Sequence, residues 1–216
     1  MKSKKKPRDL LETRREILDA AFAEIHARGF HASSLEAILE RTRHTKGALF
    51  HQFASKLELG YAVVDEVIVP MTHARWVEPL ATFENPLEGV LRLLEANIGE
   101  APRAMLDLGC PVNNLVQEMA NTDAGFRRRL RRLVEGWIDG VESHVKRGQA
   151  AGLVRKSANA RSVAEYVVAS IEGVYGLVKI VRDESVLRSL VTSMATFFAC
   201  ISDDVAANGA SRRRSR

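Results

Sequence analysis

Apolar residues recur along most of this chain at the three- and four-residue spacing of amphipathic helices, and strict apolar/polar alternation is absent. The longest pattern runs from Phe126 to Val145, roughly five helical turns. Two further long patterns cover residues 161–181 and 184–205. These patterns predict an all-α protein.

Helix-starting and helix-breaking residues divide the rest of the chain into shorter helices. Capping residues predict helix starts at Thr13, Ser33 or Ser34, Ser55, Asn85 and Asp123. Pro70 is expected to bend or end the helix that begins at Ser55. The predicted helices cover residues 13–29, 34–41, 46–51, 55–68, 85–98, 110–121 and 123–148, followed by the two C-terminal helices.

The segment from Ser33 to Lys56 stands out because two short apolar faces lie close together in it. One face is Leu35, Ile38 and Leu39, and the other is Leu49, Phe50 and Phe53. Only Thr42 to His44 separate them, which leaves room for a tight turn and no strand. A helix, a tight turn and a second short helix form the motif that places a helix in the major groove of DNA.

The net charge of +5 is confined to the part of the chain that carries this motif. Residues 1–56 hold 12 Lys and Arg against 7 Asp and Glu, whereas the remaining residues hold 20 of each. A basic segment beside a neutral remainder is typical of a DNA-binding module joined to another domain. The lysines near the N-terminus either add to DNA binding or only solvate a tail, and Arg127–Arg132 is expected to be a solvated helix face.

Three domains or segments are expected. Residues 1–56 form a helix-turn-helix domain with a basic tail at 1–9, residues 57–210 form a helical effector-binding and dimerisation domain, and residues 211–216 form a basic disordered tail. The two C-terminal helices have apolar faces too wide for the surface of a monomer, so they are expected to pair with a second copy as a four-helix bundle.

The N-terminal residues resemble the TetR family of bacterial transcriptional repressors. The resemblance rests on Thr13-Arg14, Ile17 to Ala21, Gly29-Phe30, Ser33 to Leu35, Ile38, Gly47 to Phe53 and Ser55-Lys56. It implies a homodimer that binds a palindromic operator in double-stranded DNA and is released by a small-molecule effector. It also implies that the helix at residues 46–51 is the recognition helix.

By this resemblance, one group of residues contacts DNA. His44 and His51 are expected to reach bases, Thr45 and Lys46 to contact a phosphate or a base edge, and Gly47 and Ala48 to let the backbone approach the groove. Those expected to hold the DNA backbone are Thr13, Arg14, Ser34, Gln52 and Lys56, and Phe50 is a further expected DNA contact.

Three positions in this segment depart from the family pattern. Thr42-Arg43 replaces the usual Ala-Gly in the turn, and Arg43 lacks the freedom of glycine at positive φ, so a strained or differently shaped turn is expected. Phe50 stands where Tyr is usual and cannot donate a hydrogen bond to phosphate. Gln52 stands where His is usual and can still donate one.

The sequence gives less information about the effector than about DNA binding. Gly109-Cys110-Pro111 resembles the electrophile-sensing subgroup of the family that includes the N-ethylmaleimide reductase repressor, and a helix start favours a thiolate. Cys110 is therefore a candidate sensor, Lys179 is the cation expected to tune it, and Trp137 is a further candidate effector-sensing residue. The alternative is a non-covalent pocket for an apolar molecule, lined by Trp76, Phe83, Met105, Met119, Trp137 and Tyr166.

Other functional classes find less support in the sequence. The six histidines are scattered, and the chain has no HExxH motif, no glycine-rich phosphate loop and no nucleophile elbow, so neither an enzyme nor a cofactor or metal site is expected. Two distant cysteines and the lack of a 20-residue apolar run indicate a cytoplasmic protein without a membrane partner. An architectural DNA-binding protein without an effector is the remaining alternative.

Overall fold

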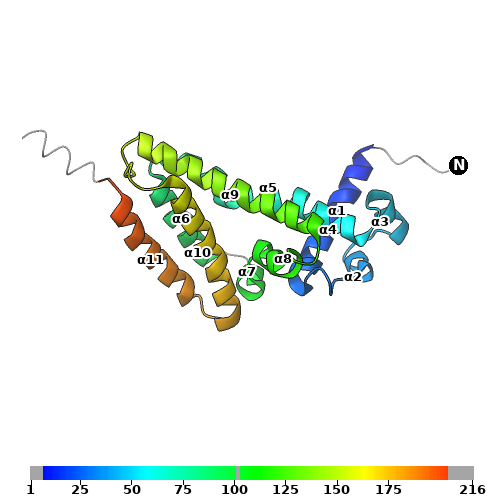
Figure 1. Cartoon of the computed structure of the whole chain (residues 1–216). Helices are drawn as coiled ribbons and strands as arrows, with labels where there is room; N and C mark the ends of the chain where they lie inside the picture. Colours follow the sequence, from blue (N-terminus) through cyan, green and yellow to red (C-terminus); the bar gives the residue numbers. More distant parts are fainter. Residues whose placement is uncertain (1–6, 101–102, 204–216) are drawn as a thin grey trace, which may run out of the picture. The chain divides into compact units, whose positions relative to one another are not determined.

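The computed structural model describes residues 7–100 and 103–203, and within these residues the regular structure is helical (Figure 1). Residues 1–6 of the predicted basic tail and the predicted tail at 211–216 lie outside the described part. The prediction of an all-α protein is confirmed, and the one β-bridge in the described part joins Val154 to Ser202. The elements are α1 (Pro7–Arg28), α2 (Leu35–Glu40), α3 (Lys46–Gln52), α4 (Lys56–Val63), η1 (Val64–Ile68), α5 (Val69–Trp76), η2 (Glu78–Thr82), α6 (Pro86–Glu100), α7 (Arg103–Leu108), α8 (Pro111–Met119), α9 (Ala124–Ala150), α10 (Ala160–Val181) and α11 (Ser185–Ile201).

The chain divides into two compact units. Unit 1 comprises residues 1–71 and 111–133, and unit 2 comprises residues 72–110 and 134–216. The divisions at Met71 and Leu133 fall inside α5 and α9, so the chain passes between the units within continuous helices. The helix-turn-helix segment belongs to unit 1, and the two C-terminal helices belong to unit 2.

Three helix starts predicted from capping residues are confirmed. The Ser55 hydroxyl accepts the N–H of Glu58 at the start of α4. The Asn85 side chain accepts the N–H of Leu87 before α6, and the Asp123 carboxylate accepts the N–H of Phe126 before α9. Each side chain satisfies a backbone donor that has no partner within the first turn of its helix.

Of the two other predicted starts, the one at Ser33 or Ser34 is confirmed at Ser34, and the one at Thr13 is wrong. Ser34, and not Ser33, caps α2 by accepting the N–H of Ala37, while Ser33 is buried and donates to the carbonyl of Phe30. Thr13 lies inside α1, which begins at Pro7, and is only 6% exposed. A capping residue near a helical pattern therefore did not mark the helix start at Thr13 or at Ser33. The helix already begins before Thr13, and Ser34 follows Ser33 and forms the cap instead.

Pro70 does not end the helix that begins after Ser55. The chain continues from α4 through one π-helical segment, η1, into α5, which contains Pro70 in its first turn. A proline has no N–H and its ring clashes with the carbonyl four residues earlier. A π-helical turn just before Pro70 is one of the local adjustments that accompany helix bends.

Unit 1 is built on α1, which packs against α2, α3 and α4. Its aromatic core joins Phe30, Tyr61 and Phe126, whose rings lie 4.8 to 5.1 Å apart in edge-to-face contacts. Glu118 of α8 accepts the N–H groups of Phe30 and His31 at 2.7 Å each. Residues that are far apart in the sequence therefore fix the end of α1.

Unit 2 is a bundle in which α10 and α11 run side by side as a hairpin, with α6 against α11 and α7 against α10 (Figure 1). Nine residues of α10 are buried, including Ile171 and Tyr175. The indole rings of Trp76 and Trp137 stack with centroids 5.9 Å apart. No helix in the described part of the chain has the length and apolar character needed to cross a membrane.

Two glycines one turn apart in α9 provide a matched test of packing in unit 2. A Cβ on Gly140 would lie 2.5 Å from Val77 Cγ1, whereas a Cβ on Gly136 would meet no atom within 4 Å. We expect Gly140→Ala to lower the free energy of unfolding by about 1–3 kcal/mol through overpacking. Gly136→Ala should raise it by about 0.5–1 kcal/mol, because alanine is the better helix former.

The measurement is chemical denaturation of each variant beside the wild type. Equal destabilisation by both substitutions would contradict the packing of α9 against Val77.

Candidate functional site

The segment α2–turn–α3 forms a helix-turn-helix in unit 1. Thr45 caps α3 by accepting the N–H of Ala48, and α2 ends at Glu40, so only residues 41–45 lie between the helices. Leu49 faces the core and is fully buried. The opposite side of α3 is exposed and consists of Thr45, Lys46, Gly47, Phe50 and His51, with Ala48 partly exposed.

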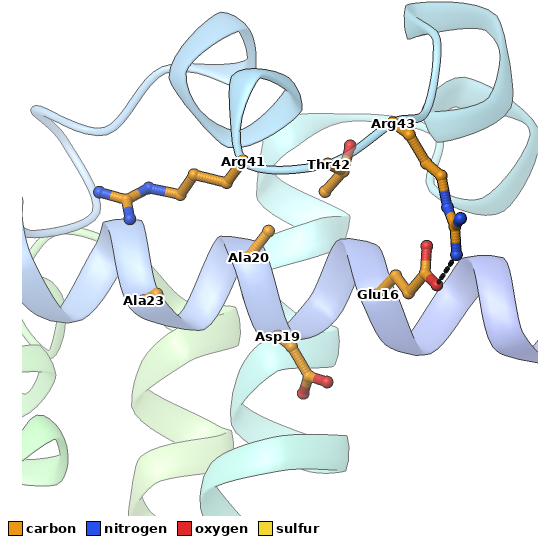
Figure 2. Close-up of a pocket in the computed structure, with 7 residues that line it drawn as sticks. All are labelled: Glu16, Asp19, Ala20, Ala23, Arg41, Thr42 and Arg43. Carbon is orange, nitrogen blue, oxygen red and sulfur yellow. Dashed lines mark hydrogen bonds and ion pairs between the residues drawn. The ribbon is translucent and has the colours of Figure 1, made fainter.

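The turn before α3 is held to α1 by ion pairs. Arg41 pairs with the buried Glu24 at 3.0 Å, and Arg43 pairs with Glu16 at 3.1 Å. His44 Nε2 lies 2.6 Å from the other oxygen of Glu16. Figure 2 shows Arg41 and Arg43 above α1 at the two ends of an open cleft of about 480 Å³, with the Arg43 guanidinium directed at Glu16.

These pairs correct the expectation of a strained turn. Arg43 does not adopt a positive φ; among the non-glycine residues of the described part, only Arg182 does. Hydrogen bonds from Arg43 and from His44 lower the pKa of the Glu16 carboxyl. Ion pairs with α1 therefore hold the turn in place, and its backbone does not need the positive φ that a glycine would permit.

Three residues expected to hold the DNA backbone are engaged inside unit 1. Arg14 donates to both carboxylate oxygens of Glu66 at 2.9 and 2.6 Å, to the carbonyl of Gln52 at 3.2 Å, and lies over the ring of Phe53. The hydrogen bond to Glu66 raises the pKa of Arg14. The Gln52 amide donates to the carbonyl of Leu10. Arg14 and Gln52 therefore fasten α1 to the end of α3 and to η1.

Lys56 is engaged in the same way. Its ammonium donates to the carbonyls of Ser33 at 2.6 Å and His31 at 3.1 Å and lies 4.8 Å from the ring centroid of Phe30. Burial lowers the pKa of Lys56. Its contacts fix the loop between α1 and α2, which positions the start of the helix-turn-helix.

Of the other predicted DNA contacts, Thr13 is buried and Ser34 uses its hydroxyl to cap α2. Lys46 is exposed, and its ammonium lies 3.3 Å from an exposed carboxylate oxygen of Glu36. Phe50 is 45% exposed although it is aromatic. The side chains of Lys46, Phe50 and His51 on α3 are therefore exposed, as are those of Glu36 on α2 and Arg43 in the turn.

Sequence reasoning missed Glu66 and Glu118, which anchor the helix-turn-helix from outside residues 1–56. Glu66 lies 52 residues after Arg14, and Glu118 lies 88 residues after Phe30. Neither glutamate belongs to a recognisable motif, because each acts through a contact that only the fold creates. The basic character of Arg14 was visible, but its partner was not.

Comparison with known proteins decides what kind of protein carries this motif. Residues 17–63 match the family model described as "Bacterial regulatory proteins, tetR family". Residues 86–194, half of the chain, match the model described as "Tetracyclin repressor-like, C-terminal domain". The chain belongs to the TetR family of transcriptional regulators. The resemblance inferred from the N-terminal residues is thereby confirmed.

Relatives of this TetR-family chain match it over most of its length. An uncharacterized HTH-type transcriptional regulator of Lactococcus lactis is 28% identical over 190 residues, which span 88% of this chain and 95% of the relative. A TetR regulator from Chloroflexus aurantiacus superposes with a TM-score of 0.80 at 25% identity, over 91% of this chain and 98% of that one.

Reduced NemR of E. coli superposes with a TM-score of 0.79 at 21% identity, over 90% of this chain and 99% of that one. At this identity the likeness to NemR shows a shared fold.

The three tentative effector residues lie in unit 2 of this TetR-family protein. Cys110 precedes α8 as predicted, is 6% exposed, and its thiol donates to Glu172 at 3.0 Å. Trp137 is 3% exposed and stacks on Trp76, whereas Lys179 is exposed on α10, two turns beyond Glu172. Of the predicted pocket residues, Met119 belongs to unit 1 and the side chain of Met105 lies outside the described part.

Proposed function

We propose that this TetR-family protein is a ligand-responsive repressor that binds a palindromic operator as a homodimer and releases it when an effector binds unit 2. The observation that carries the proposal is the exposed side of α3, where Thr45, Lys46, Gly47 and His51 are directed outward on a helix anchored at both ends. A helix held in this way can enter the major groove without rearranging its supports. Phe50 adds an apolar surface that fits the methyl group of thymine.

Arg14, Gln52 and Lys56 keep a part in this proposal as positioning residues. Arg14 and Gln52 hold the end of α3, and Lys56 holds the loop before α2. The partly exposed side chains of Arg14 and Lys56 can still contribute to the electrostatic attraction of DNA. Removing either of these two would shift the recognition helix as well as remove a charge.

The proposed dimer forms through α10 and α11. The last turns of α10 expose Leu177, Ile180 and Val181 by 55%, 81% and 55%, and a Cβ on Gly173 would meet nothing within 4 Å. Neighbouring exposed apolar side chains on one helix are typical of a surface that a partner covers. A twofold dimer spaces its recognition helices about 34 Å apart, one turn of DNA.

The proposed effector response depends on helices that pass from unit 2 into unit 1. α5 continues backwards through η1 into α4, and Glu66 of η1 holds Arg14, which in turn bonds the end of α3. An effector that displaces α5 would therefore act on the support of the recognition helix. Because coupling is reciprocal, operator DNA should weaken effector binding by the same factor that the effector weakens operator binding.

The contacts of Cys110 favour a non-covalent effector over an electrophile. Its thiol is buried and donates to Glu172. A carboxylate in this position disfavours a thiolate beside it, because the two negative charges repel. Cys110 stays a candidate sensor because it lies at a helix start, which favours a thiolate. Its contact with Glu172 has the opposite effect on the thiolate.

N-Ethylmaleimide tests this choice in a Cys200→Ser protein, whose only remaining cysteine is Cys110. We expect this protein to stay bound to its operator in a gel-shift assay after treatment, just as a Cys110→Ser, Cys200→Ser protein does. Release from the first protein and not from the second would establish Cys110 as a covalent sensor.

The remaining parts of the proposal follow from family membership. Its relatives are transcriptional regulators, which supports a regulator without enzymatic activity. A repressor that acts on chromosomal DNA works in the bacterial cytoplasm, and we place this protein there.

A further inference from the structure

Three hydrogen-bond donors in unit 2 have no acceptor within the described residues. They are the Nε of Arg75, the indole N–H of Trp137 and the hydroxyl of Tyr175. Tyr175 is 1% exposed and Trp137 is 3% exposed. Leaving a buried donor without an acceptor destabilises the folded state, so a protein that keeps three such donors in one unit calls for an explanation.

The three donors belong to one cluster formed by α5, α9 and α10. The ring of Trp137 stacks on Trp76, and the guanidinium of Arg75 lies 5.7 Å from the centroid of the Trp76 ring. The charge of Arg75 also reaches the phenol of Tyr175: burial raises the pKa of Tyr175 to about 12, and Arg75 opposes that rise. The cluster therefore combines one cation, two further donors and two stacked indole rings, and the carboxylate of Glu172 lies near the phenol and adds to the rise in the pKa of Tyr175.

The acceptors that border the cluster already have donors. Asn97 is buried, and its side-chain oxygen accepts from Arg75 Nη2. Glu172, three residues before Tyr175 on α10, accepts the thiol proton of Cys110. Within the described residues, Arg75 makes no ion pair with a carboxylate. A guanidinium that is partly buried without an anionic partner is costly, and an anion would offset that cost.

We propose that this cluster binds a small organic acid, whose carboxylate accepts hydrogen bonds from Arg75 and Tyr175 and whose apolar body packs against Trp76 and Trp137. This assignment rests on the proposed ligand response of unit 2 and names the chemical class of the effector. A guanidinium and a phenol together satisfy several lone pairs of one carboxylate. A primary amide of the same shape offers one acceptor oxygen and no charge, and an amine would meet the positive charge of Arg75.

The test uses the full-length protein and matched pairs of probes. A series of monocarboxylates from acetate to benzoate and phenylacetate is compared with the corresponding primary amides, by thermal shift and then by titration calorimetry. We expect at least one acid to raise the melting temperature and to bind measurably, while its amide binds at least tenfold more weakly.

Two variants of α10 show whether the acid uses the cluster. Tyr175→Phe removes a hydroxyl that has no hydrogen-bond partner among the described residues, so the melting temperature without ligand should stay the same or rise. The same substitution should weaken acid binding about ten- to a hundredfold, the range expected for a hydrogen bond to a charged group. Ser162→Ala, which removes an exposed hydroxyl from the same helix, should leave acid binding unchanged.

Binding of no acid in the series, equal binding of acid and amide, or unchanged acid binding by Tyr175→Phe would overturn the inference. A gel-shift assay with operator DNA separates it from the proposed function. An acid that binds without releasing the operator would support the inference and contradict the ligand response. Operator release by a neutral or cationic compound, with no acid bound, would support the ligand response and contradict the inference.

Discussion

Ile180→Glu is expected to convert the protein from a dimer to a monomer and to lower its operator affinity by about a hundredfold or more. Ile180 is 81% exposed in the last turn of α10, so a glutamate there costs little in a monomer. In a dimer that buries this surface, the same glutamate places an uncompensated charge in an apolar interface. The second recognition helix is then lost, and with it the gain from binding two half-sites at once.

Sedimentation equilibrium measures the mass directly and distinguishes one chain of 23.9 kDa from a dimer of twice that mass. Ala96→Glu, an equal change of charge at an exposed position of α6, is the matched control and should remain a dimer with unchanged affinity. A dimeric Ile180→Glu protein with wild-type affinity would exclude this end of α10 from the interface.

Lys46→Ala is expected to lower operator affinity by about 1–3 kcal/mol per recognition helix if Lys46 contacts a base, and to reduce the salt dependence of binding if it contacts phosphate. The ammonium of Lys46 lies 3.3 Å from Glu36, and both side chains are more than 60% exposed. An exposed pair of this kind contributes little to stability. Lys46 can therefore exchange Glu36 for DNA at low cost.

The measurement is a titration of operator DNA at several salt concentrations. Lys146→Ala is the control, because Lys146 is also exposed and also pairs with a glutamate, at 2.6 Å, but lies on α9 in unit 2. If Lys46→Ala matched the wild type in both affinity and salt slope, α3 would not be the element in the groove.

Local signals in the sequence predicted the helices well. The caps at Ser55, Asn85 and Asp123 act within three residues of the helix they start, so the residues that form them are neighbours in the chain. The same logic failed at Thr13 and Ser33, where a plausible capping spacing occurred beside a helix start that lay elsewhere. α7 was not predicted, because no Ser, Thr, Asp or Asn stands immediately before it in the sequence, whereas Ser34 stands before the equally short α2.

The candidate sites depended on contacts that no local signal reveals. Arg14 was expected to hold DNA because its charge is visible in the sequence, but its bond to Glu66 exists only after α1 and η1 pack together. Tyr175 was not singled out at all, because a buried hydroxyl without an acceptor can be recognised only once its surroundings are known.

The central claim is that two copies of α3 read a symmetric operator. Selecting bound sequences from random double-stranded DNA with the purified full-length protein tests it most directly. The account predicts a palindrome whose half-sites are centred about one helical turn apart or a multiple of that distance. An asymmetric site, or binding without sequence preference, would contradict it.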